Sequence, residues 1–144
     1  MKIKDVIFCD DIRRELNNKF SLMGLYSDRI VIRSRPESEV KWPVTLQLAT
    51  LIRIELEKTD LFDRFEFRYL NNEKELVMIE GAASPKKGQS FFNINLVAQL
   101  PIEKGPFGFR ITIFNRDSVV FEETQSNAIR ITQEDVAPDK PLFA

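Results

Sequence analysis

Apolar and polar residues alternate along much of the chain, and the pattern is clearest over residues 46–56. Apolar residues fill five of the six even positions of this stretch and two of the five odd positions. A period of two residues predicts a strand with one buried face. A helix that starts at Pro43 is the alternative, because Leu, Ala and Glu tolerate helical conformations. The count favours the strand.

The same alternation recurs in four later stretches. The residues predicted to point inward there are Phe65, Phe67, Tyr69, Phe92, Ile94, Leu96, Ala98, Leu100, Phe107, Phe109, Ile111, Ile113, Ile129 and Ile131. Near the N-terminus, Val6, Phe8 and Ile12 share a parity. Asp10 interrupts this parity, so a short helix over residues 10–16 stays open as an alternative to a strand.

Residues that favour tight turns fall between these stretches. Asn17-Asn18 and Asn71-Asn72 are good hairpin pairs, since Asn tolerates the positive φ that such turns require. Arg116-Asp117 is a weaker pair. Short strands at this spacing, without a convincing amphipathic helix, predict an all-β fold. We expect a single antiparallel β-sandwich of about eight strands.

The chain length of 144 residues suits one domain with a substantial core. We expect a β-sandwich domain over residues 1–132 and an extended or loose tail over residues 133–144. The apolar end of this tail, residues 141–144, could dock on this domain or on a neighbour, with disorder as the alternative.

Antiparallel connections would alternate between the two ends of the sandwich. The loops predicted at one end are 35–43, 71–74 and 101–106. The loops predicted at the other end are 17–19, 58–63, 81–90 and 116–117. A site built from loops should combine residues from one of these sets.

The chain contains no His and a single Cys, Cys9. Without His, neither a Ser-His-Asp nor a Cys-His catalytic site can be assembled, and the common zinc sites lack their ligands. No cation or helix N-terminus is identifiable beside Cys9, which favours a partly buried small residue over a reactive thiol. We expect a protein that is not an enzyme and that uses no cofactor.

Positive and negative charges nearly cancel, with 21 Lys and Arg against 22 Asp and Glu. Such a chain has no general attraction to nucleic acid or to an anionic membrane. The apolar run over residues 6–9 is too short for a signal peptide or a spanning helix. We therefore expect a cytoplasmic protein whose partners are neither nucleic acid nor membrane.

Two motif matches are rejected on their context. Ser84-Pro85-Lys86-Lys87 fits the S-x-x-K pattern of serine acyl-transfer enzymes, but it falls in a predicted loop and lacks the companion S-D-N and K-T-G motifs. Residues 104–109 resemble the aromatic signature of RNA-binding sheets. Pro106 breaks the spacing of that signature, and Phe107 and Phe109 are in register with core positions.

Trp42 is the candidate centre of a partner-binding site. It is the single Trp and lies in a loop of charged residues that ends at Pro43. Exposed Trp is favoured at interface hot spots. Arg35 in the same loop and Lys104 in the 101–106 loop complete the candidate set. The alternative is that Trp42 folds back and caps the end of the sandwich.

Asp60, Asp63 and Asp117 fall in loops at the other predicted end. Calcium prefers several oxygen ligands, and loop carboxylates of β-sandwiches can supply them. A calcium site is the alternative that these residues leave open, against ordinary exposed loops.

Residues 8–26 read FCDDIRRELNNKFSLMGLY. This stretch resembles the start of a family of small uncharacterised bacterial all-β proteins. In that family a CD-x-x-R-x-E strand turns through N/G-x-K into a strand of the pattern hydrophobic-S-L-hydrophobic-G-hydrophobic-aromatic. The resemblance implies one immunoglobulin-like sandwich in a bacterial cytoplasm or phage-related setting, and it supplies no catalytic or binding residue. Gly24 fits a bulge or a close backbone contact.

These observations favour a non-enzymatic protein-interaction or assembly module. Its partner would be another protein or a second copy of the chain, engaged through a sheet edge or through the Trp42 loop. The alternative is a sandwich that binds calcium or a small ligand with the loops at one end.

Overall fold

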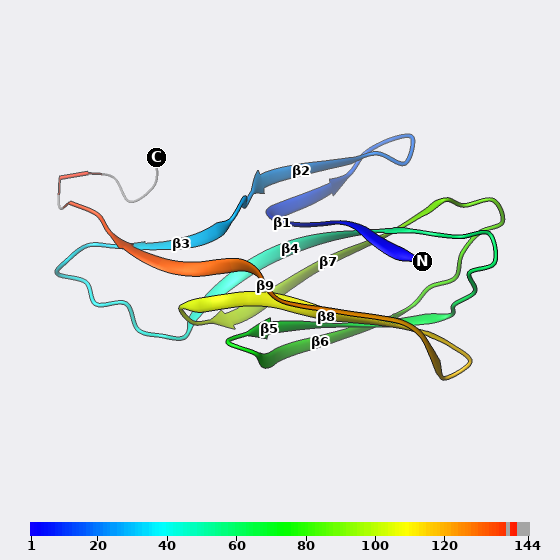
Figure 1. Cartoon of the computed structure of the whole chain (residues 1–144). Helices are drawn as coiled ribbons and strands as arrows, with labels where there is room; N and C mark the ends of the chain where they lie inside the picture. The colour runs from blue at the N-terminus through cyan, green and yellow to red at the C-terminus, as the bar shows by residue number, and fades with distance from the viewer. Residues whose placement is uncertain (138, 141–144) are drawn as a thin grey trace.

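A computed structural model describes residues 1–137, 139 and 140, and these form nine strands and no helix (Figure 1). The strands are β1 (Lys2–Arg14), β2 (Phe20–Leu25), β3 (Arg29–Ser34), β4 (Val44–Glu55), β5 (Arg64–Asn71), β6 (Lys74–Ala82), β7 (Phe91–Ile102), β8 (Gly105–Asn115) and β9 (Ser118–Asp135). The all-β expectation is confirmed. Within the described residues no helix is long and apolar enough to cross a membrane.

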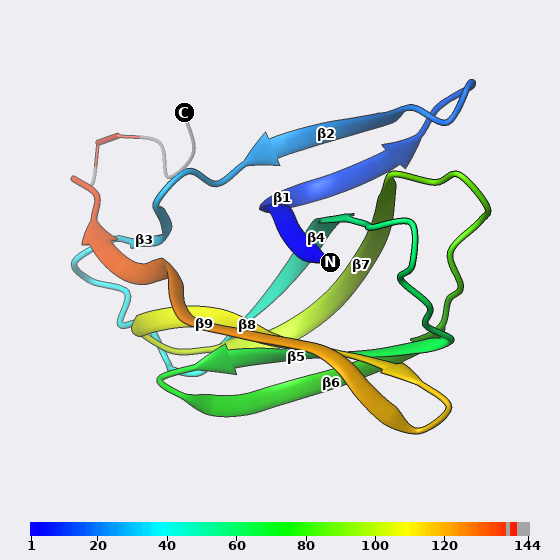
Figure 2. The same cartoon turned by 45° about the vertical axis from the view of Figure 1, so that its right-hand side comes forward.

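The strands form two sheets, with the orders β2-β1-β4-β7 and β3-β9-β8-β5-β6. Figure 2 shows the sheets curling around a shared interior, so the arrangement approaches a half barrel. The expectation of an antiparallel sandwich of about eight strands is confirmed as to two packed sheets and is corrected in this curvature and in two further details. There are nine described strands, and β3 pairs with β9 in parallel. The chain thus crosses from one sheet to the other between β2 and β3, and β3 then lies along the edge of β9.

The core lies between the sheets and is built from the alternating positions of the sequence. On β4, Thr50, Ile52 and Ile54 are fully buried, whereas Gln47 and Arg53 are exposed. The predicted inward residues of β5, β8 and the second half of β9 are all buried. Because one parity of each strand carries the apolar side chains, both sheets turn that face inward.

Aromatic rings bridge the two sheets and fill the interior. Phe8 of β1 meets Phe107 of β8 edge to face, with ring centroids 5.7 Å apart. Phe67 stacks on Phe109 at 5.5 Å. Phe92 is half-buried and contacts Phe62 edge to face, so its predicted inward position is confirmed at the margin of the core.

The helix considered for residues 10–16 does not form, because β1 continues as a strand to Arg14. Asn17 and Asn18 then take φ values of 61° and 58°, which confirms the predicted hairpin turn. Asp10 is the polar residue that interrupts the alternation of β1. It is accommodated by Gly24 of β2 and by Tyr26, which directly follows β2. Tyr26 donates its hydroxyl to Asp10 Oδ1 at 2.8 Å, and a side chain at Gly24 would collide with the Asp10 carboxylate.

The predicted turn at Asn71-Asn72 is displaced by one residue. Asn72 and Glu73 have φ values of 52° and 66°, so they form the turn, and Asn71 ends β5 as a buried residue. The Asn71 side chain accepts a hydrogen bond from the backbone N–H of Glu103 at 2.7 Å and donates to the carbonyl of Pro106 at 3.2 Å. Asn71 therefore ties the β5–β6 turn to the loop between β7 and β8.

β9 is long and locally irregular. Its register with β8 shifts at Gly108, where a side chain would collide with the carbonyl of Gln125. Residues 133–135, which the sequence placed in the tail, belong to β9 and pair with β3. Pro138 and residues 141–144, which include the apolar end of the tail, lie outside the described residues.

Candidate functional site

The loops predicted to share each end of the fold are brought together. At one end, Asn72 Nδ2 donates to the carbonyl of Lys104 at 3.0 Å, and Lys104 Nζ lies 6.0 Å from the ring centroid of Trp42. At the other end, the backbone N–H of Arg116 donates to Asp63 Oδ2 at 3.1 Å. The alternation of loops between two ends is confirmed at these contacts.

The three candidate partner-binding residues Arg35, Trp42 and Lys104 line one recess at the first end. Arg35 follows β3 and donates from Nη1 to the carbonyl of Ala137 at 3.2 Å. The other charged residues that line the recess are Glu37, Glu39 and Asp135. Charges of both signs therefore face this recess, and it has no single-sign field to select a charged partner.

Trp42 serves the fold as well as the recess. It is half-buried and packs against the hydrophobic core, next to Val44 at the start of β4. This packing agrees with the alternative that Trp42 caps one end of the fold. A residue that the fold needs in place is a weaker candidate for an interface hot spot than a fully exposed Trp.

The three aspartates of the calcium alternative do not share one site. Asp63 and Asp117 line the same recess, together with Arg64 and Glu80. Asp60 Oδ2 instead accepts from the backbone N–H of Glu57 at 2.7 Å and lies 3.2 Å from the N-terminal ammonium. Among the residues that the structure describes, no group of three or more His, Cys, Asp or Glu is placed to hold a metal ion.

Cys9 is fully buried, whereas the sequence predicted partial burial. Burial raises the pKa of the Cys9 thiol, and the neighbouring carboxylates of Asp10 and Asp11 raise it further. Its Sγ donates to the carbonyl of Asp11 at 3.5 Å. A reactive thiol requires a lowered pKa, so the surroundings of Cys9 keep it in the unreactive thiol form.

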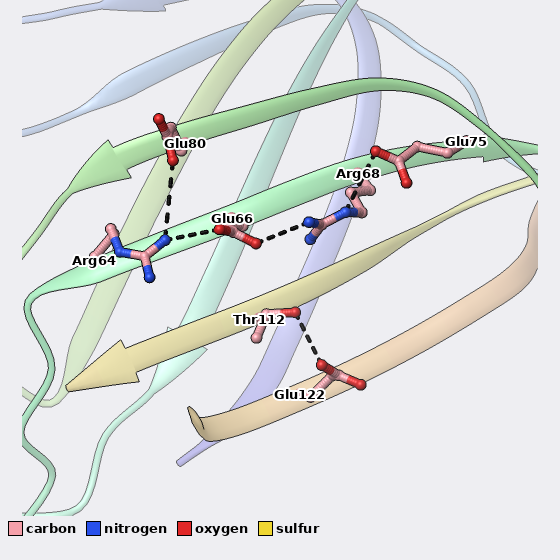
Figure 3. A network of polar contacts seen from close by, with 7 residues as sticks. All are labelled: Arg64, Glu66, Arg68, Glu75, Glu80, Thr112 and Glu122. Atoms are coloured by element: carbon pink, nitrogen blue, oxygen red, sulfur yellow. Dashed lines mark hydrogen bonds and ion pairs between the residues drawn. The ribbon is translucent and has the colours of Figure 1, made fainter. Parts of the chain in front are cut away.

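The outer face of the five-stranded sheet carries a network of ion pairs centred on Glu66 (Figure 3). Glu66 lies 2.8 Å from Arg64 and 2.9 Å from Arg68. Arg64 also reaches Glu80 at 3.9 Å, and Arg68 reaches Glu75 at 3.4 Å. The hydrogen bond from Arg64, supported by Arg68, holds the pKa of Glu66 below its ordinary value.

The neighbouring strands β8 and β9 extend this polar surface. Thr112 donates to Glu122 at 3.1 Å, and Arg110 Nε donates to Thr124 at 3.2 Å. The charged groups named on this face thus each have a hydrogen-bond or ion-pair partner on a neighbouring strand or on their own strand. Exposed pairs of this kind contribute little to stability.

The outer face of the four-stranded sheet is different in character. The pairing register sets Leu25, Cys9, Ala49 and Val97 side by side across its four strands. Because Phe8 lies in the core, its neighbour Cys9 and the whole row face outward. Cys9 and Ala49 are covered by their neighbours, whereas Leu25 and Val97 are 60% and 57% exposed. We call these four residues the outer apolar row.

β7 forms one edge of the same sheet. All of its residues pair with β4 without a register shift, from Phe91 opposite Glu55 to Ile102 opposite Val44. Its other edge pairs with no strand of the described chain. It also contains no charged residue, although 30% of the chain is charged. The uncharged run is visible in the sequence, but its place at a sheet edge follows from the pairing.

The chain matches no family model and no curated protein.

Proposed function

We propose that the protein is a non-enzymatic interaction module that binds an extended protein segment by strand addition at the free edge of β7. The observation that carries this proposal is the combination of length, regularity and neutrality in β7. An open edge presents unpaired backbone N–H and C=O groups, which form a ready template for another strand.

The other edges are blunted by features that discourage pairing. β2 and β3 have six residues each, and β3 carries Arg29 and Arg33. β6 carries Lys74 and Glu80, and its register with β5 shifts near Leu70. Short length, charges, bulges and prolines are the devices by which proteins protect exposed edges. β7 has twelve residues, no charge and no register shift, and its one proline, Pro101, lies next to its C-terminal end.

The chemistry of β7 indicates the kind of segment that it would accept. Its outward-facing side chains include Asn95, Val97 and Gln99, which are all exposed and uncharged. Backbone hydrogen bonds would supply most of the affinity, and alternate side chains would set the specificity. A partner strand with uncharged or apolar residues facing Val97 fits this edge best.

The pKa shifts of Cys9, Tyr69 and Glu66 identify no catalytic acid, base or nucleophile among these three residues. The pKa of Cys9 is raised by burial, and burial raises the pKa of Tyr69 to about 12. Both shifts favour the protonated, weakly nucleophilic form at neutral pH. Glu66 is shifted in the other direction and is held between two guanidinium groups. None of these three groups is tuned to exchange protons near pH 7.

An immunoglobulin-like relationship is part of the proposal. Immunoglobulin domains place strands G, F and C side by side, and variable-type domains add C′. The order β9-β8-β5-β6 follows this arrangement, and β4 and β7 match strands B and E. The β1–β2 hairpin and the parallel β3–β9 pair depart from it.

We place this function in the cytoplasm. The single, buried Cys9 suits a reducing compartment, where thiols stay unpaired. An interaction module without disulfides can work there without oxidative folding.

The test uses a displayed library of extended peptides selected on the intact protein. Selected peptides are titrated into the wild type, into Asn95→Lys/Val97→Lys, and into Val119→Lys as control. Val119 is 56% exposed on β9, which matches the 57% exposure of Val97. Amide hydrogen exchange of the wild type with and without peptide then locates the binding edge.

We expect the peptides to slow exchange of β7 amides and the two lysines in β7 to weaken binding about tenfold or more. The control variant should bind as the wild type does. Selected peptides that leave β7 amides unprotected, or that bind the doubly lysine-substituted protein equally well, would overturn strand addition at this edge.

A further inference from the structure

We propose that a second copy of this chain can be the partner at this edge. The two β7 strands would pair antiparallel across a two-fold axis at Val97, joining two four-stranded sheets into one. This inference rests on the proposed strand addition at β7 and names its occupant.

The register about Val97 makes β7 complementary to itself. On the outer face, Val97 would lie opposite Val97 of the second copy, and Asn95 would lie opposite Gln99. Two amide side chains can exchange hydrogen bonds in such a cross-strand pair. On the inner face, Leu96 would lie opposite Ala98, so apolar residues meet there too. Like therefore faces like over residues 94–100, whereas Asn93 would lie opposite Pro101, which has no backbone N–H to donate.

A register centred one residue earlier fits less well. It would place Asn95 opposite Val97, which pairs an amide with an aliphatic side chain. It would also leave Ile102 opposite Ser90, outside the strand. The axis at Val97 instead keeps Phe92 opposite Ile102 and uses nearly the full length of β7.

The absence of charge makes β7 better suited than the edge strand β3 to pair with its own copy. Antiparallel pairing of β3 with its own copy about Val31 would set Arg29 directly opposite Arg33. Like charges directly opposite destabilise a strand pair. β7 has no charged residue and therefore meets no such repulsion from an identical strand.

The outer apolar row gives this pairing an additional apolar contact. Val97 ends the row at the β7 edge and is more than half exposed in the single chain. In the paired sheet the row would continue directly into Val97 of the second copy. Cross-strand aliphatic pairs of this kind stabilise sheets, and the contact would remove apolar surface from water.

The experiment introduces a positive or a negative charge at Val97, the residue on the proposed two-fold axis. Val97→Lys and Val97→Glu are each studied alone and as an equimolar mixture by sedimentation velocity over a range of concentrations. The matched controls are Val119→Lys and Val119→Glu, whose parent side chain is 56% exposed on β9. Circular dichroism checks that each variant retains its β structure.

We expect the wild type to dimerise and each Val97 variant to dimerise about tenfold more weakly or worse, because two like charges then face each other. Mixing Val97→Lys with Val97→Glu should restore the dimer, because the axis sets Lys opposite Glu. The Val119 variants should behave as the wild type.

A wild type that stays monomeric at every concentration would overturn self-pairing. So would a mixture of folded Val97 variants that fails to recover the dimer. Neither result decides strand addition itself, because peptide protection of β7 amides is measured separately. Loss of both the dimer and the peptide protection would reject the two proposals together.

Discussion

The hydroxyl oxygen of Thr50 lies 2.6 Å from the phenolic oxygen of Tyr69, and this buried hydrogen bond joins the two sheets. Thr50 belongs to β4 of the four-stranded sheet and Tyr69 to β5 of the five-stranded sheet. Both side chains are fully buried. Each polar group therefore satisfies the other at a place where water cannot.

Replacing Tyr69 with Phe should lower the free energy of unfolding by about 1–3 kcal/mol, because the Thr50 hydroxyl then loses its buried partner. Urea unfolding followed by circular dichroism measures the change. Replacing Thr50 with Val as well removes both polar groups, and the double variant should be more stable than Tyr69→Phe alone. A double variant whose loss equals the sum of the two single losses would show that the hydrogen bond contributes little.

The protein should lose stability at high pH through its two tyrosines. Burial raises the pKa of Tyr69 to about 12, and burial together with Asp10 raises that of Tyr26 to about 12, from an ordinary value of 10.0. The folded state therefore resists a deprotonation that the unfolded chain undergoes readily. The stabilisation is complete below about pH 10 and is lost as the pH rises to about 12.

Denaturant unfolding at a series of pH values tests this expectation, together with tyrosinate absorbance in the near ultraviolet. Tyr26→Phe removes one of the two groups and should leave a smaller decline that belongs to Tyr69. An unfolding free energy that stays constant from about pH 9 to about pH 12 would contradict the expectation.

Gly108→Ala should destabilise the fold strongly. A side chain at this position would collide with the backbone carbonyl of Gln125, where β9 changes its register with β8. Backbone cannot move aside as a flexible side chain can, so we expect a loss of about 3 kcal/mol in urea unfolding.

Gly88→Ala is the matched control for this substitution. Gly88 has a φ of +78°, and a side chain there meets nothing within 4 Å. The cost should be about 1 kcal/mol, which is the penalty of the left-handed backbone without a collision. Equal losses for the two variants would argue against a steric origin at Gly108.

Calcium should leave the thermal midpoint unchanged. Asp60 is engaged by the N-terminus, and Asp63 accepts from the backbone of Arg116, so two of the three candidate ligands already have partners. Thermal melts in millimolar calcium and in excess chelator make the comparison, since a ligand bound by the native state raises the midpoint. A higher midpoint in calcium that Asp63→Asn abolishes would restore the calcium alternative.

Periodicity predicted the strands well because burial acts on individual side chains. The inward orientation of residues such as Phe67, Ile52 and Ile111 can be predicted from the alternation of apolar and polar residues around them. The turn at residues 17–18 was predictable for the same local reason, since Asn tolerates positive φ. Asn71 was predicted to lie in the turn, but it ends β5 as a buried residue. Its hydrogen bonds to Glu103 and Pro106 reach more than thirty residues along the chain, so a local pattern could not predict them.

The candidate binding residues were predicted in part. The sequence placed Arg35, Trp42 and Lys104 at one end, and they line one recess there. It also grouped three aspartates, of which Asp63 and Asp117 share a recess and Asp60 is paired elsewhere. Loop assignment places residues at an end of the fold, but the direction of each side chain depends on contacts that sequence patterns do not encode.

By itself the sequence determined an all-β fold, the inward face of most strands and the neutrality of residues 91–102. Only the tertiary structure decided that this neutral run is an edge strand, and that β3 joins β9 in parallel. Alternation depends on nearest neighbours along the chain and can be read from them. Strand order depends on which distant segments pair, and many orders satisfy the same local pattern.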